Sequence, residues 1–221
     1  MTAETTTVVI AVGHGVVGRV ARRACELEPG LDVIAEVRDE ADLLESCRTL
    51  RPDVLVLDDR LEGGEPTLDT LRAIREEGMA VAVVVLTDRV DGAAVLEALR
   101  LGVRGYVRKS DGLPGIGSVV RRVADGERAV DPELEQAAVM ALGRFAQQAR
   151  EGSEVEATLT ARELEILAMV SRGLTMQQVG RRLGISPRTV ETHVAKLYRK
   201  LGVRTRVQAV ARAAQLGLID P

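Results

Sequence analysis

Three glycines near the N-terminus have the spacing of a loop that binds phosphate groups. Gly13, Gly15 and Gly18 spell G-x-G-x-x-G between a short apolar run, residues 8–12, and a stretch with helical periodicity. In a dinucleotide-binding unit such glycines let a pyrophosphate approach the N–H groups at the start of a helix. Glu36 follows Gly18 by eighteen residues, where such a unit carries its ribose-binding acid. One interpretation of the loop is a site for a nucleotide or another small ligand. The other is an altered pocket that binds neither.

A second group of residues has the charge needed to bind a polyanion. The whole chain has a net charge of −3, but residues 158–221 carry 11 Lys/Arg and 4 Asp/Glu, a net charge of +7. The other 157 residues therefore carry a net charge of −10. A compact basic block in an acidic chain indicates nucleic acid as the partner of that block. A solvated basic surface with no partner would have the same composition.

The basic residues gather on one predicted helix, residues 187–201. At about 100° per residue, its apolar side chains fall in one narrow stripe, which indicates packing on a core. The stripe consists of Val190, Val194, Leu197 and Leu201. The opposite face has basic and short side chains, as a helix in the major groove of DNA does. We expect phosphate contacts from Arg188, Lys196, Arg199 and Lys200, base contacts from Glu191, Thr192 and Ala195, and further DNA contacts from Thr175 and Thr189.

Capping signals divide the chain after Thr160 into four short helices. A threonine followed three residues later by Glu or Gln predicts a capping box at Thr160, Thr175 and Thr205. Ser186 precedes a proline at the first position of the third helix, and glycines follow where each helix should end. The connection between the second and third helices has the length of a helix-turn-helix motif.

The N-terminal part of the chain has the pattern of an α/β domain. Five short apolar runs alternate with stretches of helical periodicity, which predicts a doubly wound, five-stranded parallel sheet. Beyond it we expect one amphipathic helix from about Pro132 and an exposed acidic linker at residues 151–158. The predicted organisation is an α/β domain at 1–125, a linker helix and acidic linker at 126–158, and an all-α helix-turn-helix domain at 159–221.

Composition argues against several classes of protein. The chain has no run of about 18 apolar residues and no secretory signal, so we expect no membrane span and a cytoplasmic location. His14 and His193, the two histidines, lie in different predicted domains, and Cys25 and Cys47 match no metal-binding spacing. We therefore expect no enzyme activity, no metal site and no cofactor.

Residues 159–219 resemble the LuxR-type helix-turn-helix domain of the NarL/FixJ response regulators. The likeness runs without a gap through L-T-x-R-E, G-I-S-x-R-T-V-x-x-H and K-L-G-V-x-[ST]-R. It implies sequence-specific binding of double-stranded DNA, with base reading through the predicted base-contact residues. Many members carry lysine where this chain has Glu191. The resemblance also implies dimerisation through the last helix, by Val207, Val210, Ala211 and Ala214. Packing of those side chains on their own domain is the alternative.

The first domain resembles the receiver domain of the same family, a flavodoxin-like fold, along nearly its whole length. The segment PDVLVLDD puts Asp58 at the position of the phospho-accepting aspartate. VAVVVLTD puts Thr87 at the hydroxyl position. RLGVRGYVRKS puts Tyr106 and Lys109 at the positions of the aromatic switch residue and the lysine. The resemblance thus implies that Asp58, Thr87 and Lys109 occupy three reactive positions of a receiver, and that Tyr106 is its switch residue.

The likeness fails at the acidic pair of the receiver. Alignment on His14 puts Val12 and Gly13 where the two acidic residues belong. Phosphoryl transfer to an aspartate needs Mg²⁺, which requires hard oxygen ligands. Asp58 would hold the ion almost alone, since we expect Asp59 to point to the opposite side of the strand end. Neither Mg²⁺ binding nor metal-dependent phosphorylation is therefore expected.

These expectations describe an atypical response regulator that binds promoter DNA as a homodimer without phosphorylation. Two alternatives stay open. The first is a conventional response regulator switched by a histidine kinase through Asp58. The second is a sensor of an unidentified small ligand or nucleotide at Gly13, Gly15 and Gly18.

Overall fold

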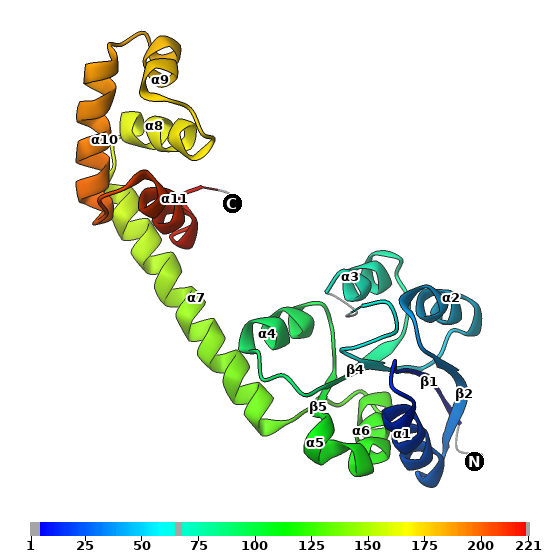
Figure 1. The fold of residues 1–221 in the computed structure, drawn as a ribbon. Helices are drawn as coiled ribbons and strands as arrows, with labels where there is room; N and C mark the ends of the chain where they lie inside the picture. The colour runs from blue at the N-terminus through cyan, green and yellow to red at the C-terminus, as the bar shows by residue number, and fades with distance from the viewer. Residues whose placement is uncertain (1–4, 65–67, 220–221) are drawn as a thin grey trace. The chain divides into compact units, whose positions relative to one another are not determined.

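The computed structural model describes residues 5–64 and 68–219, and the chain divides into two compact units (Figure 1). The first unit comprises residues 1–142 and the second residues 143–221. Helix α7 (Pro132–Thr158) begins in the first unit and ends in the second.

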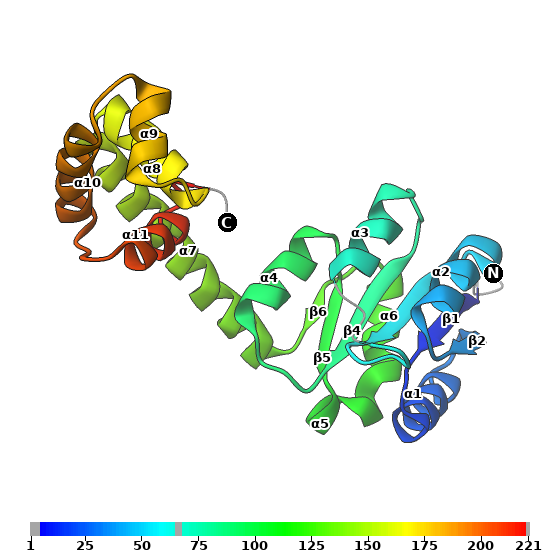
Figure 2. The same cartoon turned by 45° about the horizontal axis from the view of Figure 1, so that its top comes forward.

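A parallel sheet forms the centre of the first unit (Figure 2), and its strand order is β2-β1-β3-β4-β5-β6. The described residues form six strands: β1 (Thr6–Ala11), β2 (Leu31–Val37), β3 (Val54–Asp58), β4 (Ala82–Thr87), β5 (Gly105–Arg108) and β6 (Ala129–Val130). All neighbouring strands are parallel. The predicted doubly wound α/β fold is confirmed. The short β6 adds to the five expected strands because Ala129 and Val130 pair with the start of β5.

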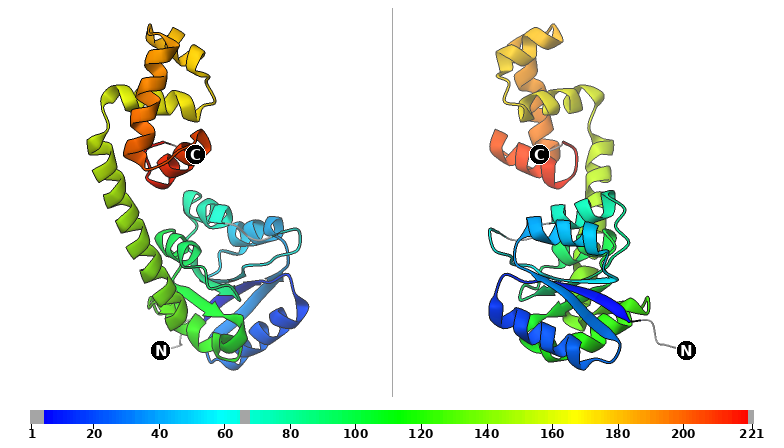
Figure 3. Two further views of the ribbon diagram at one scale, coloured as in Figure 1. Left: turned by 60° about the vertical axis from the view of Figure 1, so that its left-hand side comes forward. Right: turned by 90° about the vertical axis from the view of Figure 1, so that its right-hand side faces the viewer.

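Alternate residues of each strand enter two separate cores, one on each face of the sheet. Along β1, Val8 and Ile10 lie in one core, and Val9 lies in the other. Helices α1 (Gly15–Leu27) and α6 (Ile116–Ala124) cover the first face, and α2 (Glu40–Leu50), α3 (Leu68–Glu76) and α4 (Gly92–Arg100) cover the second (Figure 3). The short α5 (Lys109–Gly112) and η1 (Leu113–Gly115) connect β5 to α6. Because the strands are parallel, their carboxyl ends meet at one edge of the sheet.

Helix α7 packs within each unit by a different part of its length. In the first unit Leu134 and Ala138 join the core beneath α3 and α4. In the second unit Gly152 lies so close to the carbonyl of Leu216 that a Cβ would collide with it, and Glu151 pairs with Arg212. The segment 151–158, expected as a linker after the helix, is instead the end of α7, while its residues 153–154 and 156–158 are exposed, as expected. These tertiary contacts keep the segment helical despite its Gly-Ser sequence.

The rest of the second unit is a bundle of short helices. Between residues 159 and 219 the chain forms α8 (Ala161–Ser171), α9 (Met176–Leu183), α10 (Pro187–Leu201) and α11 (Arg206–Gln215). All three predicted capping boxes are present, and Ser186 caps α10. Gly184 and Gly202 end α9 and α10 in the left-handed conformation. None of the helices in the described parts of the chain has the length and apolar character to cross a membrane.

Candidate functional sites

The predicted phospho-acceptor lies in a buried ion pair. Asp58, the last residue of β3, is fully buried, and its Oδ1 accepts hydrogen bonds from Lys109 Nζ at 2.8 Å and from the backbone N–H of Arg60 at 2.9 Å. Its other carboxylate oxygen, Oδ2, is buried and has no hydrogen-bond partner among the residues that the structure describes. The carboxyl ends of β3 and β5 thus bring Asp58 and Lys109 together, as the resemblance to receivers implies.

Asp59 belongs to the same cluster. Its Oδ1 accepts a hydrogen bond from Lys109 Nζ at 2.9 Å, and its Oδ2 accepts one from Thr87 Oγ1 at 2.5 Å. The expectation that Asp59 points away from Asp58 is therefore wrong. Strict alternation holds only within a strand, and here β3 ends at Asp58, where the hydrogen bond from Arg60 turns the chain.

The cluster separates the pKa values of its two carboxyl groups. Burial raises the pKa of Asp58 above its ordinary value, against the lowering effect of Lys109. Burial also raises the pKa of Asp59, but hydrogen bonds from Thr87 and Lys109 outweigh it and the pKa is lowered. The pKa of Lys109 is depressed by burial but raised on balance by its bonds to the two carboxylates. Lys109 therefore stays protonated at neutral pH, and Asp58 is the carboxyl group that protonates first as the pH falls.

Val12 and Gly13 take the places of the acidic pair in a tightly packed region. Val12 is buried in the core, and a Cβ at Gly13 would lie 2.8 Å from the carbonyl oxygen of Arg60 and 2.9 Å from the amide nitrogen of Glu62. Gly13 donates a backbone hydrogen bond to Arg60, and Glu62 donates one to Arg38. The segment 60–62 therefore lies directly against Gly13. The residues that the structure describes include no group of three or more His, Cys, Asp or Glu placed to hold a metal ion.

The other two glycines of the loop have different surroundings. A Cβ at Gly18 would lie 2.6 Å from Glu36 Oε1, so Gly18 permits close packing of α1 on β2. The carboxylate of Glu36 also faces Arg22, 3.6 Å away. At Gly15 the nearest atom to an added Cβ is a guanidinium nitrogen of Arg19 at 3.6 Å, so this position is open. Packing thus accounts for Gly13 and Gly18 without a ligand.

Thr87 and Tyr106 line a cavity of about 210 Å³ beside Asp58 and Asp59. The side chain of Tyr106 is directed inward and is only 7% exposed. Burial raises the pKa of Tyr106 to about 12, with a further contribution from Asp59 and Asp91. All of the predicted receiver residues therefore lie at or next to the end of the sheet.

Helix α10 presents the predicted DNA-binding face to solvent. Its apolar stripe is buried, as expected: Val190, Val194, Leu197 and Leu201. The opposite side is exposed and contains Arg188, Glu191, Thr192, Ala195, Lys196 and Arg199. Thr192 Oγ1 donates to the carbonyl of Arg188 at 3.0 Å, which fixes its rotamer. The exposed Thr175 and Thr189 lie at the starts of α9 and α10, where Thr175 caps α9 and Thr189 pairs with Ser186.

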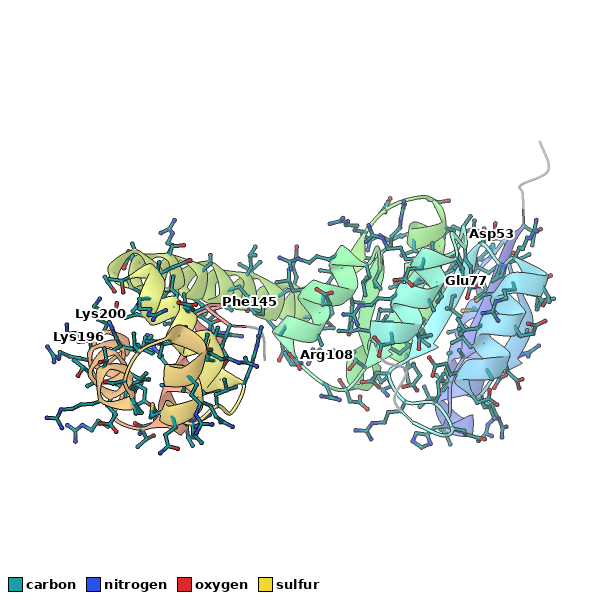
Figure 4. All side chains as sticks on the ribbon, turned by 90° about the horizontal axis from the view of Figure 1, so that it is seen from above. Asp53, Glu77, Arg108, Phe145, Lys196 and Lys200 are labelled. Carbon is teal, nitrogen blue, oxygen red and sulfur yellow. The ribbon has the colours of Figure 1, made fainter. Side chains whose placement is uncertain are left out.

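Lys200 is exposed like the residues of that face but differs from them in its partners. Its Nζ donates to Glu163 Oε2 at 2.6 Å and to the carbonyl of Thr158 at 2.8 Å. Figure 4 labels Lys200 and the exposed Lys196 on the same unit. Glu163 is 2% exposed, and although burial raises its pKa, bonds from Lys200 and Thr160 lower it to about 2. Lys200 thus forms an ion pair within its own unit, and its expected phosphate contact stays a prediction. The capping-box pattern predicted a role for Glu163 at the start of α8. No local pattern predicts its pair with Lys200, thirty-seven residues later.

Helix α11 divides its apolar residues between two environments. Ala209 and Ala213 are fully buried in the core of the unit. Of the four predicted dimerisation residues, Val207 is 79% exposed, Ala211 is exposed, and Val210 and Ala214 are half-buried. Packing on their own domain is therefore excluded for Val207 and Ala211 within the described chain. Dimerisation through this helix stays a prediction.

Comparisons with known proteins agree with this geometry. The family model "Response regulator receiver domain" matches residues 8–121, and "Bacterial regulatory proteins, luxR family" matches residues 157–213. The nitrate/nitrite response regulator protein NarP of Escherichia coli is 31% identical over 204 residues, 91% of each chain. The response regulator protein VraR of Staphylococcus epidermidis is 30% identical over 193 residues, 86% of this chain and 87% of VraR. The crystal structure of the response regulator ChrA, from a heme-sensing two-component system, matches with a TM-score of 0.52 and 28% identity over 98% of this chain and all of ChrA.

The matches cover both units, and the structure contains the receiver sheet and the exposed helix of the DNA-binding motif. The chain therefore belongs to the NarL/FixJ family of response regulators, transcriptional regulators that join a receiver domain to a LuxR-type DNA-binding domain.

Proposed function

We propose that this response regulator binds promoter DNA as a homodimer without being phosphorylated. The observation that carries the proposal is the packing of Gly13. An acidic side chain there would occupy the space that the backbone of Arg60 and Glu62 fills, at 2.8–2.9 Å from the first side-chain atom. A magnesium site would thus lack the two carboxylates of the family and would need this segment to move.

The charge balance at Asp58 supports the same proposal. Lys109 donates to both Asp58 and Asp59, so the ammonium already offsets part of their charge in the absence of a metal or phosphoryl group. Phosphoryl transfer gathers further negative charge on oxygens beside these groups. The residues that follow β1, Val12 and Gly13, have no carboxylate that could bind a neutralising cation.

Helix α10 provides the surface for DNA. Its exposed basic side chains suit phosphate contacts, and Glu191, Thr192 and Ala195 lie between them where base edges would be read. A dimer formed through the exposed side of α11 would present two such helices to a roughly palindromic site. Because phosphate contacts release counterions, affinity should fall steeply with salt. The proposal includes no catalytic step.

A conventional switch at Asp58 is the second candidate, and one specific observation favours it. Asp58, Thr87 and Lys109 are in the positions that the family uses, and Asp58 Oδ2 is free of protein hydrogen bonds within the described residues. A histidine kinase would be the partner in that case.

Titration of the protein's own upstream DNA separates the two candidates. The unmodified protein should bind with an affinity that Asp58→Asn leaves within about twofold, since no phosphoryl group is involved. Beryllofluoride with Mg²⁺ should change neither the affinity nor the sedimentation coefficient. Weak binding that becomes tight with beryllofluoride in the wild type, and not in Asp58→Asn, would replace the proposal by the conventional switch.

A further inference from the structure

The cavity beside Asp58 has an apolar wall and a polar end. It measures about 210 Å³ and lies between α3, α4 and the strands β3, β4 and β5. The apolar wall includes Leu57, Leu71, Val85, Ala94 and Ala98. An apolar wall of this kind suits a small organic molecule and offers no ligand to a hydrated metal ion.

The polar end of the cavity favours a positively charged donor. Three carboxylates line it, those of Asp58, Asp59 and Asp91, against one guanidinium, that of Arg89. Lys109 Nζ bonds to one oxygen of Asp58 and one of Asp59, which leaves Asp58 Oδ2 buried without a partner in the described chain. A buried acceptor without a donor is costly, and an ionised group bound to it forms a strong, charge-assisted hydrogen bond.

We propose that this cavity binds a small primary amine with an apolar body, whose ammonium donates to Asp58 Oδ2. The carboxylates oppose an anionic ligand at the same place. A neutral molecule of the same shape would fill the apolar wall but would make a weaker bond to the carboxylate. The proposal adds a ligand to the proposed function but does not rest on it, because the amine binds the unmodified carboxylate of Asp58, which is present under either candidate function.

A ligand in the cavity would change the packing of α7, because α4 contacts both the cavity and α7. Ala94 and Ala98 of α4 line the cavity. On the same helix, Gly92 lies so close to the carbonyl of Ala137 in α7 that a Cβ would collide with it. Leu134 of α7 is fully buried in the same core. A ligand that shifts α4 must therefore shift the packing of α7 in the first unit, which makes α7 the element through which an amine would regulate the protein.

Calorimetric titration of the full chain with phenethylamine tests the proposal, with 2-phenylethanol as the neutral control of the same shape. We expect saturable binding of the amine and at least about tenfold weaker binding of the alcohol. Ala94→Leu places a larger side chain in the cavity, and Asp58→Asn removes the charge that meets the ammonium, so each should weaken amine binding about tenfold or more. Ala93→Leu is the matched control on the exposed side of α4 and should leave binding unchanged.

Thermal unfolding without ligand must show that each variant is folded. Should Ala94→Leu fail to fold, Asp58→Asn, which keeps the side-chain shape, carries the test. The proposal is overturned if the wild type shows no saturable binding of the amine at millimolar concentration. It is equally overturned if the alcohol binds as well as the amine, or if Ala94→Leu and Asp58→Asn bind like the wild type. None of these results bears on the DNA titration, because no DNA or phosphodonor is present.

Discussion

The two candidate sites of this protein treat their charges in opposite ways. At the end of β3, Asp58 and Asp59 share the ammonium of Lys109, and Asp58 is fully buried while Asp59 is partly buried. On α10, Arg188 and Lys196 face outward from a helix whose other side is core. Buried charges that pair with one another change the stability of the fold and the pKa values of the paired groups. Exposed basic side chains are free to bind the phosphates of a polyanion. Substitutions should therefore change stability at the first kind of site and DNA affinity at the second.

Lys200 is expected to give the largest effect, because it lies on α10 but its ammonium pairs with the buried carboxylate of Glu163. Lys200→Ala leaves the carboxylate of Glu163, 2% exposed, without its ammonium. We expect the free energy of unfolding of the protein to fall by about 2 kcal/mol, because a buried carboxylate loses its charged donor while solvent reaches the Lys200 side of the pair. Urea unfolding measures the loss. DNA affinity of the folded variant should change little, and a large affinity loss with normal stability would show that Lys200 contacts phosphate instead.

The same ion pair predicts a pH dependence. The pKa of Glu163 is about 2, against an ordinary value of 4.5, so its contribution to stability is present above about pH 4.5 and is lost as the pH falls towards 2. Between about pH 5 and about pH 3, the wild type should lose about 2 kcal/mol more stability than Glu163→Gln, which has no carboxyl group to protonate. Urea unfolding at the two pH values gives the difference. Parallel losses in the two proteins would mean that Glu163 is not held ionised by Lys200.

Signals read along the sequence predicted most of the second unit and less of the first. Capping boxes, as at Thr160, and left-handed glycines, as at Gly184, act within one turn of a helix, so the pattern alone located the helices of the bundle. The pair of Lys200 with Glu163 and the contact of Gly13 with Arg60 join residues far apart in sequence. Such contacts exist only once tertiary packing has formed, and no local pattern encodes them.

Gly13 gives the clearest test of the packing at the altered receiver pocket. Gly13→Ala puts a methyl group 2.8 Å from the carbonyl oxygen of Arg60, and backbone must move to admit it. We expect a loss of about 2 kcal/mol in the free energy of unfolding. Gly15→Ala is the matched control, because its Cβ has only the mobile guanidinium of Arg19 at 3.6 Å, and its effect should stay within about 0.5 kcal/mol. Equal effects of the two substitutions would mean that segment 60–62 does not pack on Gly13.

Glu191 is an exposed acid on the basic face of α10. Glu191→Ala should reduce the preference for one base of the target by about 1 to 2 kcal/mol, because a carboxylate in the groove can accept a hydrogen bond from cytosine. A binding-site selection followed by titration of single-base variants measures the preference. Overall affinity should stay constant or rise, since a charge repelled by phosphates is removed. A uniform loss across all bases would show that Glu191 does not read sequence.

Substitution of Lys196 should give the smallest effect, and that effect should be on DNA affinity and not on stability. Its exposed ammonium lies on the same helix as Lys200 but outside the pair with Glu163, so Lys196→Ala should leave the free energy of unfolding within about 0.5 kcal/mol of the wild type. Loss of one phosphate contact should lower affinity severalfold for every DNA sequence alike and reduce the slope of log K against log salt by about 1. Titrations over a salt series measure both quantities. Because Lys196→Ala and Lys200→Ala remove the same charge from the same helix, an equal loss of DNA affinity in both would show that net charge alone governs binding. A loss of stability in Lys200→Ala with a loss of affinity in Lys196→Ala would show that the pair with Glu163 sets the role of Lys200.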